Sequence, residues 1–318
     1  MTIFAQELQE FVAPEVEWYH LSPIIALISG ALFLMVVGAL TPRWPRNLYA
    51  LVTAATAAIA GVLAVLQWNT ISDDGPATLV GGAVAFDVFT QYLTIIVCAA
   101  TLLVALVTSD ELHRTGRDGP EIYALLLVAA TGAIVMGAAN DLIVMFLGLE
   151  TLSLALYVLA ASDRFRPESQ ESGIKYFVLG GFASAFFLYG IALVYGGTGS
   201  EFRSGSTNIT EIIESFQSRV LTGGDDAIVL AGIALLIVGL GFKVAAVPFH
   251  VWTPDVYQGA PTAVTAFMAS VGKAGAFAAM LRVLVVALPF HRDDWVPAIW
   301  VLAALSLVVG SILAVVQT

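Results

Sequence analysis

Stretches of about 20 consecutive apolar residues recur along the whole chain, and each is long enough to cross the roughly 30 Å hydrocarbon core of a bilayer as an α-helix. Inside a bilayer every backbone polar group needs a partner within the protein, so only helices and closed β-barrels can span it. A barrel would show strictly alternating segments of about ten residues, and the sequence has none. We therefore predict an all-α, multi-pass membrane bundle with nine transmembrane helices, at residues 21–40, 48–68, 86–108, 122–139, 142–161, 174–195, 227–247, 262–288 and 295–316.

The composition agrees with this class and excludes several others. Hydrophobic residues make up 59% of the 318 and charged residues 12%, whereas a soluble domain has about half and a quarter. The single cysteine, Cys98, lies inside the third run, which excludes a disulfide framework. No nucleotide-binding fingerprint occurs, and the four histidines do not fall at metal-ligand spacing. We expect no metal, no cofactor and no redox centre in this chain.

Arginine and acidic residues are sorted between alternate loops, which predicts the orientation. Short loops rich in Arg and Lys stay on the cytoplasmic side. The opposite loops are mostly acidic and account for much of the net charge of −11, which argues against a nucleic-acid partner. We expect a multi-pass protein with its N-terminus outside, and the richness in Ala, Val and Gly favours a bacterial plasma membrane. The loops predicted to be cytoplasmic hold Arg43, Arg46, Arg114, Arg117, Arg164 and Arg166.

All three lysines lie inside apolar runs, at Lys175, Lys243 and Lys273, whereas nine of the ten arginines lie in loops. The tenth, Arg282, is expected to reach the membrane interface. A buried ammonium can lose its proton near neutral pH, whereas a guanidinium stays charged. Glu150, in the middle of the fifth run, is the matching acid. Because each charge at mid-helix costs about 3 kcal/mol on an insertion scale, the set favours an ion or proton path.

Structural readings of the same charges stay open. A buried ion pair that serves packing alone would explain Glu150 and Lys273. Lys175 lies near the predicted cytoplasmic start of its helix, where it could extend its ammonium to the lipid headgroups.

The stretch GFKVAAVPFHVWTPDVYQGAP, residues 241–261, predicts that the seventh helix is broken. Pro248 removes one backbone donor and clashes with the carbonyl four residues earlier, leaving polar groups that hydrocarbon cannot satisfy. Pro254 and Pro261 follow within the same segment. A discontinuous membrane helix beside a lysine is typical of mid-membrane ion sites in transporters. His250, inside the break, suits either proton transfer or the capping of freed carbonyls.

One longer loop contains the pattern TNITEIIESFQSRV, which predicts an amphipathic helix on the outer surface. Its apolar face would carry Ile209, Ile212, Ile213, Phe216 and Val220. Asn208 and Glu211 are spaced as a capping box.

The segment FKVAAVPFHVWTPDVYQGAPTAVTAFMASVGKAGAF closely resembles the signature of subunit N of the proton-pumping NADH:quinone oxidoreductase, respiratory complex I. GLETLSLALYVLA and ESGIKYFVLGGFASAFFLYGIALVYG resemble the fifth and sixth helices of the same antiporter-like subunits. The resemblance implies partners among the other membrane-arm subunits, including other antiporter-like ones, and contact with the lipid bilayer. It also implies that NADH, flavin, iron–sulfur clusters and quinone bind to partner subunits.

The resemblance further implies a proton relay made by Glu150, Lys175, Lys243, Lys273 and His250. Glu150 and Lys175 would form an ion pair, Lys243 would carry the pumped proton, and Lys273 would pass it on. Opening the pair would leave Lys175 uncompensated, and its like charge would make Lys243 give up its proton. His250 would lie at the helix break.

The family has about 14 helices, in which helices four to eight are repeated in inverted form. The expected organisation is an outer N-terminal segment at 1–20, three peripheral helices within 21–118, a five-helix repeat at 119–290, and the first helix of an incomplete second repeat at 291–318. We expect a truncated chain. Two other functions stay open, a cation/proton antiporter subunit not coupled to NADH and a structural membrane scaffold.

Overall fold

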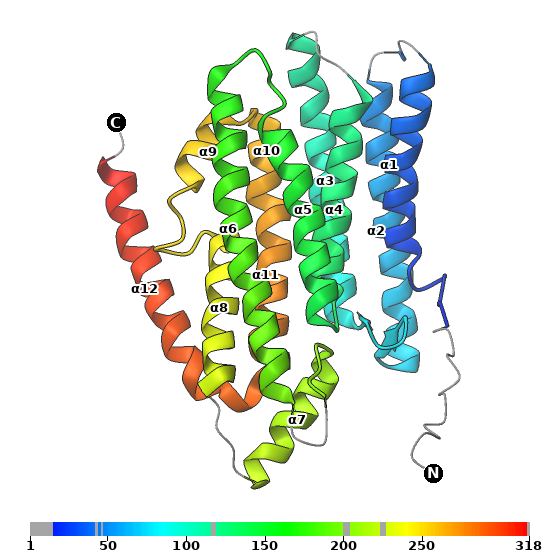
Figure 1. The fold of residues 1–318 in the computed structure, drawn as a ribbon. Helices are drawn as coiled ribbons and strands as arrows, with labels where there is room; N and C mark the ends of the chain where they lie inside the picture. Colours follow the sequence, from blue (N-terminus) through cyan, green and yellow to red (C-terminus); the bar gives the residue numbers. More distant parts are fainter. Residues whose placement is uncertain are drawn as a thin grey trace, which may run out of the picture.

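The long helices of the chain run antiparallel, side by side, in a computed structural model that describes residues 15–41, 44–45, 47–115, 119–199, 204–222 and 227–316 (Figure 1). Within these residues nine helical segments are long and apolar enough to span a membrane, as predicted. Eight of them are α1 (Ser22–Leu40), α2 (Leu48–Asp74), α3 (Val88–Thr115), α4 (Pro120–Ala138), α5 (Leu142–Ala160), α6 (Pro167–Thr198), α8 (Ala227–Val244) and α12 (Arg292–Val316).

The remaining span, from Thr262 to Ala287, alternates between two kinds of helix. It consists of α10 (Thr262–Phe267), the π-helical turn η1 (Met268–Gly272), α11 (Lys273–Leu281) and a second π-helical turn η2 (Arg282–Ala287). π-turns inside α-helices occur frequently at functional sites. In this span each one adjoins a basic residue, because η1 ends just before Lys273 and η2 begins at Arg282.

Helix ends follow local signals in the sequence. Pro120 and Pro167 stand in the first turns of α4 and α6, where no backbone donor is needed. Asp141 caps α5, since its Oδ1 accepts a hydrogen bond from the backbone N–H of Ile143 at 2.7 Å. The C-terminal ends of α1, α3 and α5 lie at the same end of the bundle (Figure 1), the Arg-rich end. Arg43, Arg46 and Arg117 lie outside the described residues.

The opposite, acidic end carries the shorter elements. A hairpin of β1 (Ala77–Leu79) and β2 (Val84–Phe86) lies there, a small departure from the predicted all-α fold. Its turn needs left-handed backbone, with φ of 63° at Gly81 and 85° at Gly82.

The amphipathic helix is α7 (Ile209–Thr222), at the same end. Ile209, Ile212 and Phe216 are buried, as predicted, while the side chain of Val220 lies outside the described part. Asn208 Oδ1 accepts from the backbone N–H of Thr210 at 3.0 Å.

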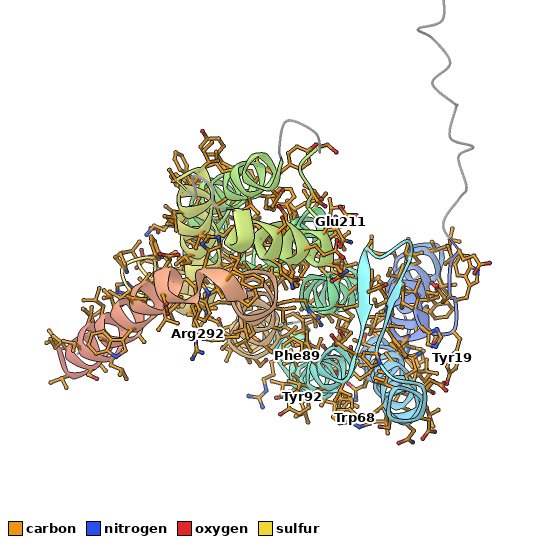
Figure 2. The ribbon with its side chains drawn as sticks, turned by 90° about the horizontal axis from the view of Figure 1, so that it is seen from below. Tyr19, Trp68, Phe89, Tyr92, Glu211 and Arg292 are labelled. Atoms are coloured by element: carbon orange, nitrogen blue, oxygen red, sulfur yellow. The ribbon has the colours of Figure 1, made fainter. Side chains whose placement is uncertain are left out.

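The view from the acidic end places Tyr19, Trp68 and Tyr92 around the rim of the bundle (Figure 2). Tyr19 is 52% exposed and Tyr92 55% exposed. Tyrosine and tryptophan favour the membrane–water interface, because an amphipathic ring has one apolar and one polar side. This rim is consistent with the acidic end lying at a bilayer surface.

Small residues bring α4 and α5 into backbone contact at the centre of the bundle. A Cβ added at Gly132 of α4 would lie 2.4 Å from the backbone N of Leu152, and one at Gly148 would lie 2.5 Å from the backbone N of Met136. Close approach of this kind holds membrane helices together, because lipid supplies no hydrophobic force between them. The contact fixes the height and rotation of α5, the helix that carries Glu150.

A buried ion pair joins η2 to the start of α3 near the acidic end. Arg282 is 5% exposed, and its two terminal nitrogens donate to Asp87 Oδ2 at 2.8 Å and Oδ1 at 3.1 Å. Its Nε donates to the carbonyl of Gly137 at 2.8 Å, and Nη2 donates to the Thr90 hydroxyl at 2.9 Å. The prediction that Arg282 reaches the membrane interface is therefore wrong, because Asp87 and the carbonyl of α4 satisfy its charge inside the protein.

The pKa of the Asp87 carboxyl reflects this pairing. Burial by itself would raise the pKa, but the hydrogen bonds and charge of Arg282, with those of Thr90, hold it below the ordinary 3.8. A lowered pKa in the folded protein stabilises it at any pH above the ordinary carboxyl value. That contribution is lost as the pH falls through the lowered value.

We expect Asp87→Ala to lower the free energy of unfolding by about 3 kcal/mol, because it leaves the Arg282 charge buried and unpaired. Thermal unfolding of the purified protein in detergent measures this. Asp110→Ala is the matched control, since the Asp110–Arg114 pair is exposed, with an N–O distance of 2.7 Å, and should cost at most about 1 kcal/mol. The difference between wild type and Asp87→Ala should shrink only below about pH 4. Equal losses in the two variants would contradict the assigned role.

Candidate functional site

The predicted break in the seventh transmembrane segment is present. Helix α8 ends at Val244, and a helix resumes only at α9 (Thr253–Gly259). The end of α8 is a Schellman motif, in which the N–H of Ala246 donates to the Gly241 carbonyl at 2.9 Å and the N–H of Ala245 to the Phe242 carbonyl at 3.1 Å. Ala245 holds the left-handed conformation with φ 62°, where glycine is usual, so the backbone is strained here.

The prolines of the segment take the positions that the break allows. Pro248 lies in the turn between α8 and α9, Pro254 lies in the first turn of α9, and Pro261 precedes α10. None of these positions requires a helical N–H donor.

Three side chains, one from the break itself and two from other segments, satisfy backbone groups at the break. Lys273 Nζ donates to the carbonyl of Lys243 at 3.0 Å. The indole N–H of Trp252 donates to the Phe242 carbonyl at 3.0 Å. On the other side the N–H of Val247 donates to the hydroxyl of Ser306, on α12, at 3.0 Å. The break is thus connected to the eighth span and to α12 by direct hydrogen bonds.

Lys243 lies in the last turn of α8, is 4% exposed, and is enclosed by aromatic rings. Its Nζ lies 5.1 Å from the ring centre of Tyr176, 5.4 Å from Tyr157 and 5.9 Å from Phe242. Ring faces attract a cation. Among the described residues Nζ has no hydrogen-bond partner. An ammonium held by rings without fixed acceptors is suited to exchange its proton, because protonation and deprotonation break no protein hydrogen bond.

Lys273 packs against the same group of aromatic rings. Its Nζ is 4.9 Å from the ring centre of Trp252, and Trp252 stacks on Tyr176 with ring centres 4.6 Å apart and planes at 8°. Lys243 is over the other ring of this stack, and the two ammonium groups are close enough for their charges to interact. The structure thus brings Lys243 and Lys273 together, each against one ring of the Tyr176–Trp252 stack.

Glu150 completes the buried group. It lies in the middle of α5, and its Oε1 is buried with no hydrogen-bond partner among the described residues. The Glu150 charge interacts with the Lys243 ammonium. A carboxyl without a fixed donor beside an ammonium without a fixed acceptor is a costly arrangement in a low-dielectric interior. Such a pair is typical of a site selected for function rather than for stability.

Lys175 is placed differently from the expectation. Its ammonium is 2.5 Å from Asp255 Oδ2 and 2.7 Å from Glu171 Oε1, so it does not pair with Glu150. Its side chain is 41% exposed and borders a cavity of about 170 Å³, lined also by Glu168, Gln258 and neighbouring small residues. The expected ion pair between Glu150 and Lys175 is therefore wrong for this structure. Two carboxylates at the Arg-rich end reach the ammonium at a smaller desolvation cost than a buried one would.

His250 lies in the turn between α8 and α9 and is partly buried. Its Nδ1 is buried and has no hydrogen-bond partner among the described residues. The structure thus brings it to the break but not into contact with a carbonyl through this nitrogen, and its predicted part in the relay remains a prediction.

Several residues that shape the site were not anticipated from the sequence. No sequence pattern identifies Ser306 or Trp252 as a partner of the break, because a serine in an apolar helix and a tryptophan beside prolines are common in membrane proteins. The partner of Asp255 could not be read from the sequence either, because Lys175 on α6 is 80 positions away.

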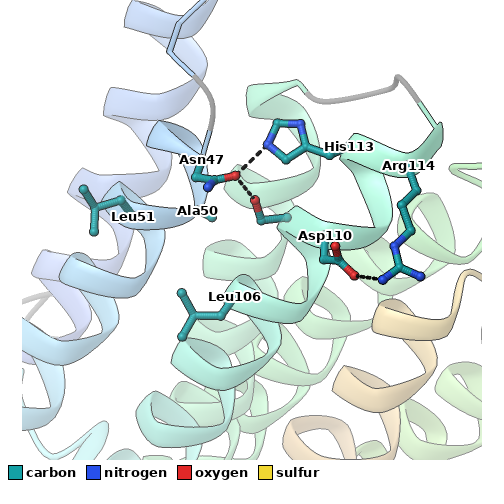
Figure 3. A pocket seen from close by; sticks show the side chains of 8 residues that line it. Asn47, Ala50, Leu51, Leu106, Asp110, His113 and Arg114 are labelled. Atoms are coloured by element: carbon teal, nitrogen blue, oxygen red, sulfur yellow. Dashed lines mark hydrogen bonds and ion pairs between the residues drawn. The ribbon is translucent and has the colours of Figure 1, made fainter.

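A larger cavity, of about 490 Å³, lies near the Arg-rich end between α2 and α3 (Figure 3). Its polar groups already pair with one another. Asn47 Oδ1 is 2.6 Å from His113 Nε2 and accepts from the Ser109 hydroxyl at 2.9 Å, and Asp110 pairs with Arg114. None of Glu150, Lys243 and Lys273 borders this cavity. The broken helix is therefore the better candidate site. Among the described residues no group of three His, Cys, Asp or Glu could hold a metal ion.

Comparisons with known proteins find one family along much of the chain. Residues 139–318 match the family described as NADH:quinone oxidoreductase/Mrp antiporter, TM. The chain is 40% identical over 341 residues to the NADH-quinone oxidoreductase subunit N of Beutenbergia cavernae, covering 97% of this chain and 62% of that relative. It therefore spans less than two thirds of that relative's length.

Solved structures show the same fold. A chain of respiratory complex I from Thermus thermophilus, with bound aureothin, has a TM-score of 0.73 at 35% identity, over 93% of this chain and 58% of that chain. A chain of the membrane-bound sulfane sulfur reductase, an archaeal respiratory membrane complex, has a TM-score of 0.71 at 26% identity, over 85% of this chain and 53% of that chain.

The hydrogen bond from Val247 to Ser306 predicts a local loss of protection at the break. Ser306→Ala should leave a buried N–H without a partner and cost about 1–3 kcal/mol. Hydrogen–deuterium exchange of the segment 244–250 should accelerate, while α4 and α5 stay unchanged. Ser311→Ala is the matched control, because Ser311 lies on the same helix and is exposed. Unchanged exchange in Ser306→Ala would show that α12 does not hold the break.

Proposed function

Because this chain belongs to the NADH:quinone oxidoreductase/Mrp antiporter family, we propose that it acts as a proton-translocating subunit in the membrane arm of NADH:quinone oxidoreductase. The observation that carries the proposal is the buried Lys243 ammonium, without a fixed acceptor, at a broken membrane helix. In this role the chain carries no redox centre of its own, and NADH, flavin, iron–sulfur clusters and quinone bind to partner subunits.

The relay uses Glu150, Lys243 and Lys273 as the groups that bind protons inside the bilayer. Lys243 receives a proton from Glu150 and passes it to Lys273. Transfer requires Lys273 to be neutral when the proton arrives, because two ammonium groups at this separation repel each other. The hydrogen bond from Lys273 Nζ to the Lys243 carbonyl holds the acceptor amine next to the break. His250, in the turn that follows, is a further group available to the path.

Lys175 does not bind the relayed proton in this arrangement, but its position affects the charge balance of the relay. With its ammonium held by Asp255 and Glu171, the Glu150 carboxylate acts on Lys243 without competition from a second cation. Movement of Lys175 towards Glu150 would weaken that attraction and favour release of the Lys243 proton. Motion in partner subunits would drive this exchange.

The alternative is a cation/proton antiporter subunit that is not coupled to NADH, since the family description includes Mrp antiporters. It would use the same lysines. The names of the relatives favour the first function, because the matched relative is an NADH-quinone oxidoreductase subunit. A purely structural scaffold is disfavoured by the unpaired buried charges, which cost stability without improving packing.

The proposed partners are the other membrane-arm subunits, including other antiporter-like ones, and the lipid bilayer, in a bacterial plasma membrane. The proposed organisation is a peripheral group of three helices within 21–118 and a five-helix repeat at 119–290. The segment 291–318 would open a second repeat, and residues 1–20 would lie outside the cell, of which 1–14 fall outside the described residues.

The first test is whether the tagged full-length protein, gently solubilised from its native membrane, co-migrates with NADH dehydrogenase activity on a native gel. We expect co-migration. Lys243→Met in the assembled complex should then reduce proton translocation at least tenfold, and Lys243→Arg should do the same, because guanidinium keeps its proton. Migration as a small particle without that activity would reject this function and make cation/proton exchange in liposomes the next assay.

The orientation has its own test, which uses the single native cysteine. In a Cys98→Ala background, Ser204→Cys at the acidic end should react with a membrane-impermeant maleimide on intact cells. Gln170→Cys at the Arg-rich end should react only after the cells are opened, because Arg-rich loops stay in the cytoplasm. Labelling of Gln170→Cys on intact cells would reverse the proposed topology.

A further inference from the structure

The hydroxyl of Tyr157, like Glu150 Oε1 and Lys243 Nζ, is buried and meets the geometry of a hydrogen bond with no residue of the described chain. Tyr157 is 6% exposed and lies two helical turns after Glu150, on the same face of α5. Between them on that face, the Ser153 hydroxyl donates to the Leu149 carbonyl. A buried hydroxyl without a partner is costly, and native proteins usually avoid one unless it serves a purpose.

Tyr157 faces both members of the charged pair. Its ring centre is 5.4 Å from Lys243 Nζ, and the Glu150 charge interacts with its hydroxyl as well as with Lys243. The ring also makes edge contacts with Tyr176, at 4.7 Å between centres, and Phe177, at 5.7 Å. This packing positions the hydroxyl, which has the Ser153 hydroxyl as a polar neighbour on the same helix.

A glycine on the neighbouring helix makes room for this hydroxyl. A Cβ at Gly180 of α6 would lie 2.0 Å from the Tyr157 hydroxyl oxygen and 2.7 Å from the ring carbon that bears it. The next residue, Gly181, has open space at the same position, with nothing within 4 Å of an added Cβ. Glycine costs helix stability, about 1 kcal/mol relative to alanine. At Gly180 that cost preserves the space for a polar atom between α5 and α6.

We propose that Tyr157 is a proton-carrying residue of the relay, and that Gly180 keeps its hydroxyl in place. When a protonated Glu150 loads a neutral Lys243, the Glu150 O–H bond breaks and the proton moves onto the Tyr157 oxygen, over bridging water where needed. The hydroxyl releases its own hydrogen in the same step, and a new N–H bond forms at Lys243. Tyr157 is a neutral phenol before and after, while Glu150 ends as carboxylate and Lys243 as ammonium. This inference rests on the proposed function.

Tyr157→Phe tests the hydroxyl separately from the ring. Phenylalanine keeps the ring that holds Lys243, so assembly of the complex on a native gel should not change. Proton translocation into membrane vesicles, normalised to assembled protein, should fall about tenfold. This fall is smaller than the effect usual for one positioned acid–base group, which is about 100-fold or more. The deuterium isotope effect on translocation should rise, because the step that the hydroxyl served becomes slower than the others.

Gly180→Ala and Gly181→Ala test the same hydroxyl from the opposite helix. Both add one methyl group to α6, but only the first meets Tyr157. We expect Gly180→Ala to lower translocation several-fold in the assembled complex and Gly181→Ala to leave it unchanged. If Gly180→Ala fails to assemble, Tyr157→Phe still decides the question.

The outcomes separate this inference from the function on which it depends. If Lys243→Met abolishes translocation while Tyr157→Phe keeps both its rate and its isotope effect, the Tyr157 role is rejected and the relay function stands. If Lys243→Met also leaves translocation unchanged in an assembled complex, the proposed function itself is rejected. A fall in both Tyr157→Phe and Gly180→Ala, with Gly181→Ala unaffected, supports the Tyr157 role.

Discussion

The need to satisfy backbone polar groups at a helix break, in the absence of water, organises the centre of this protein. The Schellman turn that ends α8 leaves the Lys243 carbonyl without a helical donor, and hydrocarbon offers none in its place. Lys273, Trp252 and Ser306 provide partners from three different segments. Any displacement of the break therefore changes the position of a titratable amine, an indole and a serine of α12 together.

The charged residues divide into two groups according to what satisfies them. Arg282 and Asp87 form a fully bonded pair near the acidic end, and such a pair fixes the register of α3 against η2. Glu150 and Lys243 have buried polar atoms that no described residue bonds, and Lys243 is held by ring faces instead. The bonded pair serves structure, since its charges cannot change without loss of stability. The unbonded pair can change protonation with little rearrangement, which suits a relay.

Close backbone packing makes that unbonded pair possible. Gly132 and Gly148 lock α4 against α5 through backbone contact, so Glu150 is held in depth and rotation without a hydrogen bond of its own. The aromatic stack of Tyr176 and Trp252 packs against both lysines, with one ring near Lys243 and the other near Lys273. In the proposed relay, this rigid packing would let small shifts of Lys175 or of the break alter protonation without a large motion of the bundle.

The sequence by itself determined the membrane class, the nine spans, the break at Pro248 and the placement of Glu150, Lys243 and Lys273 inside the spans. Hydropathy, proline chemistry and the cost of charge in lipid depend on local sequence, so no tertiary information was needed. The partners of these residues were decided only by the tertiary structure. Lys175 joined Asp255 rather than Glu150, Arg282 turned inward to Asp87, and Ser306 reached the break from α12. Each such contact joins residues far apart in the chain, and which of several chemically suitable partners is reached depends on helix rotation and packing that no local pattern encodes.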